Sequence, residues 1–249
     1  MNMVLILLNR EWIEFKKNFL SVFLLWFLLP LLIHITIALP LSKVITVSIL
    51  YLNWSSAGIW VVSSCLVSLL ISIKFLNNIK NQNNHINALL QTPVSNIHLL
   101  NVSLIKGSIY GIFQFVIAIT ITSVLKQEYF STFEILLITI QIGILVLFFS
   151  SLGTLLGMIV SNILIFIQLI LYFFLILAFG LGTFIPLNKY PIGYILFVDK
   201  IPLTNIILNL QKVIINEPLD WLSFFTTILL IVLTNIISLI ISYKVVRKI

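Results

Sequence analysis

The sequence predicts an all-α membrane protein with six transmembrane helices. Only 8% of the 249 residues are charged and 61% are hydrophobic, whereas an ordinary soluble domain is about 25% charged. The charged residues also lie between long uncharged stretches. Each stretch is at least about as long as the ~20-residue helix that crosses a bilayer core of ~30 Å.

One uncharged stretch, residues 135–188, is too long for a single span. Its 54 residues would extend roughly 80 Å as one helix, so it must hold two spans. Ser161 and Asn162 favour turns and helix caps, and they predict the break. The six expected spans are residues 18–42, 48–73, 107–125, 135–160, 163–185 and 221–243.

Lys and Arg are divided unequally between the two sides of this layout. With the N-terminus inside, the inner segments hold nine basic residues and two acidic ones, while the outer segments hold five of each. The positive-inside rule then predicts that both termini are cytoplasmic in a multi-pass protein of a cell membrane, which we expect to be bacterial. The excess of basic residues is explained by membrane lipid, and no nucleic-acid partner is expected.

Residues 1–17 predict an amphipathic helix at the membrane surface. At 100° per residue, Leu8, Trp12 and Phe15 share one arc with other apolar side chains, while Glu11 and Lys17 share the opposite polar arc. A helix with this division lies in the headgroup plane with its apolar side toward the lipid. The alternative is a simple extension of the first span into the cytoplasm.

Polar residues interrupt the apolar chain at 79–106. Ile86, Leu89 and Leu90 predict a short helix with an apolar stripe, which ends at the Thr92-Pro93 pair. Ser95 is a good N-cap for a second helix that continues into the third span. A short helix in this place can transmit a push to that span. The alternative is an ordinary solvated loop.

Three segments resemble those of ABC-2 type transporter permeases. Residues 83–107 read NNHINALLQTPVSNIHLLNVSLIKG and resemble the family's cytoplasmic coupling segment. Residues 182–211 read GTFIPLNKYPIGYILFVDKIPLTNIILNLQ and resemble its hairpin after the fifth span. Residues 10–32 read REWIEFKKNFLSVFLLWFLLPLL and resemble its interfacial helix with the first span.

The resemblance implies a role for each segment. The interfacial helix would use Leu8, Trp12 and Phe15, and residues 186–220 would form an extracellular re-entrant hairpin. The hairpin residues that match the family are Pro186, Pro191, Pro202 and Thr204. The residues implied in coupling to an ATPase are His85, Ile86, Asn87, Ala88, Leu89, Leu90, Gln91, Thr92, Pro93, Val94 and Ser95.

The resemblance also implies partners. These are a separate ABC ATPase subunit and a second permease subunit, identical or related. No G-x-x-x-x-G-K-[ST] phosphate loop occurs in the sequence. We therefore expect the chain to bind no cofactor and to have no catalytic residues of its own, with ATP and Mg²⁺ bound by the partner ATPase. His85 and His98 are separated by a proline break and predict no metal site.

The expected cargo is hydrophobic, amphiphilic or lipid-linked, because no Asp, Glu, Lys or Arg falls within an expected span. An ion-coupled carrier would need such residues. An equally open interpretation is that the uncharged spans reflect only their contact with lipid and carry no information about the cargo. Two alternatives remain. One is a polytopic enzyme acting on lipid, for which the outer acids Asp199, Glu217 and Asp220 are the only cluster. The other is a non-catalytic immunity or scaffold protein.

Some polar and small residues within the spans predict helix contacts. Gln114, Gln141 and Gln168 predict hydrogen bonds between helices, and Gly153 with Gly157 predicts close helix packing. Pro30 should bend the first span, with the carbonyl that it frees satisfied locally.

Overall fold

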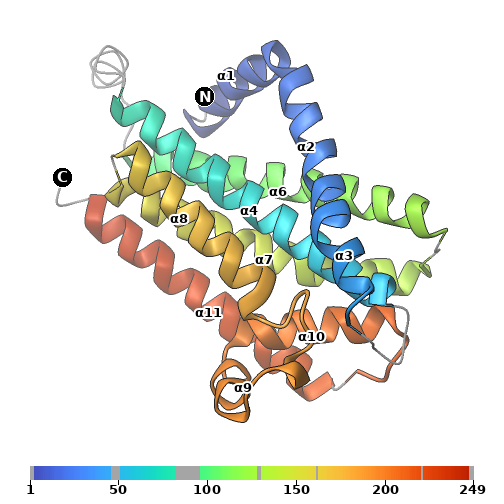
Figure 1. Cartoon of the computed structure of the whole chain (residues 1–249). Coiled ribbons are helices and arrows are strands. Elements are labelled where there is room, and N and C mark those ends of the chain that lie inside the picture. Colours follow the sequence, from blue (N-terminus) through green and yellow to red (C-terminus); the bar gives the residue numbers. More distant parts are fainter. Residues whose placement is uncertain are drawn as a thin grey trace.

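The computed structural model describes residues 3–45, 51–81, 96–127, 130–160, 162–219 and 221–246. Within these ranges every regular element is a helix, so the all-α prediction is confirmed (Figure 1). The elements are α1 Met3–Lys17, α2 Phe19–Ile33, the π-helix η1 His34–Ala38, α3 Leu39–Ser42, α4 Tyr51–Asn81, α6 Asn96–Lys126, α7 Thr132–Ile159, α8 Ile163–Leu175, the π-helix η2 Ile176–Gly180, the 3₁₀-helix η3 Leu187–Lys189, α9 Ile192–Val198, α10 Pro202–Ile214 and α11 Trp221–Val246.

Five helical stretches in the described ranges are long and apolar enough to cross a membrane. They are Phe19–Ser42, Tyr51–Ile79, Ile97–Lys126, Thr132–Ile159 and Phe224–Ile241. The multi-pass membrane character predicted from composition is therefore supported. The expected fifth span, 163–185, is shorter in the structure, because the apolar helix runs over Leu164–Gly180 only. It ends at Gly180, and Gly182 then turns the chain with a φ of +75°.

The helix boundaries near residue 160 follow from local caps. α7 begins with a capping box, in which the Ser131 hydroxyl accepts from the Glu134 N–H while the Glu134 carboxylate accepts from the Ser131 N–H. At the other end Val160 is extended, and the Asn162 side chain accepts from the Leu164 N–H to cap α8. The break between α7 and α8 thus lies where the Ser161-Asn162 pair predicts it.

α4 is the central helix of the molecule and lies between α6 and α7 (Figure 1). In the most apolar stretch of α4, 83% of the residues are buried, a larger share than in any other candidate span. Glycines on both neighbours allow this close approach. A Cβ on Gly107 of α6 would meet the Ser68 carbonyl oxygen at 2.9 Å, and one on Gly153 of α7 would meet the Leu69 carbonyl oxygen at 2.8 Å. Gly157 packs in the same way against Ile73 and Leu76, as predicted.

A chain of serine hydroxyls joins the three helices where they meet. The Ser68 hydroxyl donates to the Val146 carbonyl at 2.9 Å. The Ser72 and Ser150 hydroxyl oxygens lie 3.1 Å apart. The Ser150 hydroxyl also donates to the Leu104 carbonyl at 2.7 Å, and the Ser103 hydroxyl donates to the Ser72 carbonyl at 3.1 Å. Small hydroxyls therefore let the backbones approach closely, and they find their hydrogen-bond partners on the neighbouring helices.

Pro30 attaches α2 to α6. Proline has no N–H, so the Trp26 carbonyl four residues earlier loses its helical donor. The Gln114 amide nitrogen on α6 donates to this carbonyl at 3.0 Å. The freed carbonyl is thus satisfied by a neighbouring helix rather than locally, and the predicted interhelical bond of Gln114 is confirmed. Gln141 is buried with no hydrogen-bond partner among the described residues, and Gln168 is exposed, so neither makes the predicted bond.

The close packing of glycines against α4 can be tested by comparing alanine substitutions at two positions of α7, Gly153 and Gly143. Gly153→Ala should lower the free energy of unfolding by about 1–3 kcal/mol, because the new methyl group overlaps the α4 backbone. Gly143→Ala is the matched control on α7, since a Cβ there meets nothing within 4 Å. It should change the free energy of unfolding by about 1 kcal/mol at most, in the stabilising direction. Equilibrium unfolding in mixed micelles measures both, and equal values would contradict the packing.

Candidate functional site

The residues expected to couple to an ATPase, His85 to Ser95, lie outside the described residues. The helices that flank them are described. α4 continues to Asn81, and α6 begins at Asn96 and runs without a break to Lys126. The helix that the sequence places after Ser95 is therefore continuous with the third span. Both flanking ends lie close to α1 (Figure 1).

α1 packs against α6, and its apolar side belongs to a buried cluster that also includes the ends of α4 and α7. Leu7 is buried, and Val4 and Leu8 pack beside it. The buried side chains around them come from three other helices: Phe75, Leu76, Leu100, Val102 and Met158. Part of the apolar side of α1 therefore contacts protein, which the prediction of a purely lipid-facing arc missed.

The other two predicted interfacial residues differ in their surroundings. Trp12 remains 54% exposed, as expected for a headgroup anchor. Phe15 is half-buried, and its ring centroid lies 5.8 Å from both Trp26 on α2 and Tyr110 on α6. Phe15 thus joins α1, α2 and α6, where it packs with the Trp26–Tyr110 pair.

Glu11 differs from one expectation from the sequence. It was expected on the outward polar arc of α1, but only 5% of its surface is exposed and it is paired with Lys106 and Arg10. Lys106 lies one residue before the expected third span, 107–125, and inside the longer helix Ile97–Lys126 that is long and apolar enough to cross a membrane. That helix begins well before residue 107, as the sequence predicts, and Glu11 neutralises Lys106 there.

The ion pair fixes the charge state of Glu11. Burial alone would raise the pKa of the Glu11 carboxyl, but the Lys106 ammonium and then the Arg10 guanidinium outweigh burial and lower it below 4.5. A lowered folded-state pKa stabilises the folded form above the unfolded pKa. The pair therefore contributes fully at neutral pH, and its contribution is lost as the pH falls below about 4.5. The Lys106 ammonium also lies 5.4 Å from the Phe75 ring centroid.

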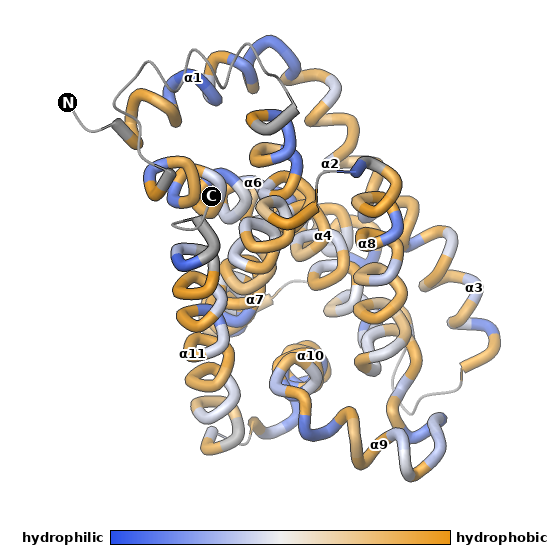
Figure 2. The backbone as a smooth tube through the Cα atoms, turned by 90° about the vertical axis from the view of Figure 1, so that its left-hand side faces the viewer, coloured by the Kyte–Doolittle hydropathy of each residue, from blue (hydrophilic) through white to orange (hydrophobic). Residues whose placement is uncertain are grey.

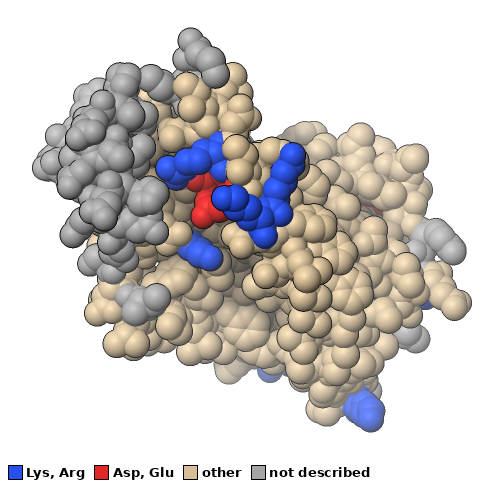
Figure 3. Space-filling model, turned by 90° about the horizontal axis from the view of Figure 1, so that it is seen from above, with Lys and Arg blue, Asp and Glu red and all other residues tan. Residues whose placement is uncertain are grey.

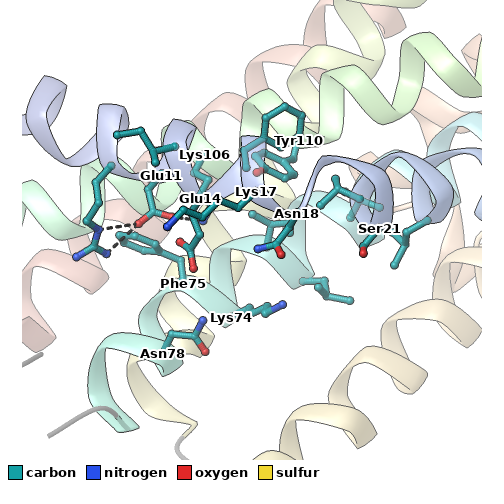
Figure 4. Close-up of a pocket in the computed structure, with 18 of the residues that line it drawn as sticks. Glu11, Glu14, Lys17, Asn18, Ser21, Lys74, Phe75, Asn78, Lys106 and Tyr110 are labelled. Carbon is teal, nitrogen blue, oxygen red and sulfur yellow. Dashed lines mark hydrogen bonds and ion pairs between the residues drawn. The ribbon is translucent and has the colours of Figure 1, made fainter. Parts of the chain in front are cut away.

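A pocket of about 690 Å³ opens beside this ion pair (Figure 4). We call it the α1–α2 pocket. Basic and acidic side chains lie together in a hollow of the surface around it (Figure 3). Its lining residues come from four helices: Arg10, Glu11, Ile13, Glu14, Phe15 and Lys17 of α1; Asn18, just before α2; Ser21, Val22, Leu25 and Trp26 of α2; Val67, Leu70, Ile71, Lys74, Phe75, Asn78 and Ile79 of α4; and Lys106 and Tyr110 of α6.

The chemistry of the pocket is that of a binding site. It presents ammonium, guanidinium, carboxylate and amide groups beside aromatic and aliphatic walls. No group of three His, Cys, Asp or Glu side chains that could hold a metal ion occurs among the described residues. The sequence does not reveal this pocket, because Lys74 and Lys106 stand between uncharged stretches like ordinary loop charges. The apolar neighbours Leu104, Ile105 and Gly107 were the available signal that Lys106 needs a partner.

The expected hairpin residues form a second structured region at the opposite end of the molecule (Figure 2). Pro186 and Pro191 immediately precede η3 and α9, and Pro202 opens α10. α9 and α10 meet at a bend of 96°. Thr204 is fully buried where α10 packs against α4, α7 and α11.

Hydrogen bonds to the chain just before the hairpin hold this region in place. The Tyr51 hydroxyl on α4 donates to the Phe184 carbonyl at 2.6 Å. The Gln211 amide on α10 donates to the Gly182 carbonyl at 3.1 Å, and the Tyr194 hydroxyl on α9 donates to the Gly180 carbonyl at 2.7 Å. The prolines therefore set the helix starts, and the tyrosines and Gln211 attach them to the bundle.

Comparisons of the chain with protein-family models, with curated proteins and with solved structures give no match.

The Glu11–Lys106 pair predicts how firmly α1 is docked. In a chain that carries Cys65→Ser and Leu7→Cys, a thiol reagent should react slowly with the new cysteine, because position 7 lies on the buried side of α1. Adding Glu11→Gln should raise the labelling rate about tenfold or more, since a lost charged hydrogen bond costs about 1.5–3 kcal/mol. Glu11→Gln with Lys106→Met should label more slowly than Glu11→Gln alone, because no uncompensated ammonium is left.

Glu14→Gln is the matched control for this measurement. Glu14 lies one turn along α1 and is exposed. Its substitution should leave the labelling rate of Leu7→Cys unchanged. Equal rates for the Glu11→Gln and Glu14→Gln variants would show that the ion pair does not hold α1 in place.

Proposed function

We propose that this chain is the membrane-spanning permease subunit of an ATP-driven ABC transporter of the ABC-2 type. The observation that carries the proposal is the path of α6. It starts directly after the segment that resembles a coupling helix and continues as one rigid helix through a candidate span. A force applied to the segment before Asn96 would therefore move the third span directly, because no hinge interrupts α6 between them.

The docking of α1 adds to this argument. Glu11 ties α1 to Lys106 on α6, and Gln114 ties α2 to the same helix. A movement of α6 would then carry the interfacial helix and the first span with it. α1, α2 and α6 would therefore move together when a partner bound at their shared face changes its conformation. In this proposal that face is cytoplasmic, as the distribution of Lys and Arg predicts.

The proposed transporter has six spans in each permease subunit. The helix Ile163–Gly180 supplies the fifth span, at about 27 Å of length. A bilayer thins locally around a helix of that length at modest cost. The bent pair α9–α10 forms the re-entrant hairpin on the outer side. Two permease subunits and separate ATPase subunits complete the assembly, with ATP and Mg²⁺ bound by the ATPases.

The proposed cargo is a hydrophobic, amphiphilic or lipid-linked compound moved outward. The interior helix contacts support this class, because α4, α6 and α7 are joined by serine hydroxyls and glycines rather than by charges. Such surfaces offer no titratable relay for an ion-coupled carrier. The source of energy must then be a soluble partner.

The proposal predicts the effect of two substitutions in the coupling segment. Leu89→Asp with Leu90→Asp should abolish co-purification of the partner ATPase, because the apolar stripe that would enter its groove becomes charged. The thermal unfolding midpoint of the permease should not change. The matched control is Lys189→Asp with Lys200→Asp, which also adds two carboxylates but at exposed sites at the opposite end. Normal co-purification of the Leu89→Asp, Leu90→Asp variant would refute the coupling role.

A further inference from the structure

The α1–α2 pocket changes character along its depth. Asn18 and Ser21 line its outer part from the start of α2, and Leu25 and Trp26 line its inner part. α4 approaches the same end in the opposite direction and repeats the order, from Asn78 and Lys74 to Leu70 and Val67. At ~1.5 Å per residue these walls extend about 12 Å along α2 and about 16 Å along α4.

The outer part of the pocket carries excess positive charge. Four cations and two carboxylates line it, which leaves a net charge of +2. Glu11 is already matched by Lys106 and Arg10. Lys17 and Lys74 are exposed, and neither makes an ion pair within the ranges the structure describes. The Lys17 and Lys74 side chains line the same pocket as Glu14 and the amides of Asn18 and Asn78 (Figure 4), and their ammonium groups are suited to a phosphate group.

The inner part adjoins exposed apolar surface of α2. Leu25 lines the pocket and is also 49% exposed on α2, which is a candidate membrane span. The pocket is lined by α1, the helix on which the exposed Trp12 is suited to anchor at the headgroups. A ligand there would have its charged end among the lysines and its apolar end against Leu25, Leu70 and Val67.

From these observations we propose that the α1–α2 pocket binds one anionic phospholipid from the leaflet in which α1 lies. The phosphate contacts Lys17 and Lys74, and an acyl chain follows the groove between α2 and α4. The volume of about 690 Å³ accommodates a headgroup and the first part of a chain. This proposal concerns the pocket alone, and it holds or fails independently of the proposed transport function.

The test uses the full chain in detergent and native mass spectrometry to measure affinity for the first bound lipid. The probes are phosphatidylglycerol and phosphatidylcholine with the same oleoyl chains. The wild-type chain should bind phosphatidylglycerol more tightly by about tenfold or more, since each lysine near an anionic lipid adds severalfold. Lys17→Gln with Lys74→Gln should remove that preference.

Two further arms identify the site and the source of the phosphate. Lys189→Gln with Lys200→Gln removes the same charge at the opposite end and should keep the wild-type preference. Leu70→Trp should weaken binding of both lipids by filling the groove. Inorganic phosphate at millimolar concentration should not displace phosphatidylglycerol. The proposal is overturned if the Lys17→Gln, Lys74→Gln variant keeps the preference, if both double variants lose it equally, or if inorganic phosphate competes fully.

Discussion

The close approach of α4 to α6 and α7 is the contact on which the rest of the structure depends. Gly107, Gly153 and Gly157 leave no room for a side chain between these backbones. The Ser68 hydroxyl donates to the Val146 carbonyl there, and the Ser72 and Ser150 hydroxyls are paired with each other. In lipid, where apolar surfaces gain little by meeting each other, such packing and hydrogen bonding hold helices together. α4 therefore acts as a fixed core for the other helices.

Polar contacts add to the apolar packing that attaches α2, α1 and the α9–α10 hairpin to this core. α2 is held through the carbonyl freed by Pro30, α1 through Glu11 and Lys106, and the hairpin through Tyr51 and Gln211. Each contact joins a peripheral element to a helix of the core or to the chain beside it. This organisation separates a rigid interior from an N-terminal layer that is attached by few bonds, and the α1–α2 pocket lies within that layer.

The sequence predicts much of the fold because membrane helices follow from composition. The uncharged stretches predict the helices, Asn162 predicts a break, and Gly153 predicts close packing. The Glu11–Lys106 pair was missed because helical periodicity shows that Glu11 is polar, but not that α6 passes beneath it. The end of the fifth span was placed late, because hydropathy continues past Gly180 while the backbone turns at Gly182. The α1–α2 pocket needs four helices in register, which no single segment encodes.

The most direct test of the central contact is disulfide cross-linking in native membranes. In a Cys65→Ser background, Ser72→Cys with Ser150→Cys places thiols where hydroxyl oxygens lie 3.1 Å apart, so oxidation should form an intramolecular disulfide. Ser72→Cys with Thr139→Cys is the control, because Thr139 is exposed about 16 Å further along α7. The account predicts full cross-linking of the first pair and none of the second. Free thiols at positions 72 and 150 after oxidation, detected by alkylation in denaturant, would contradict it.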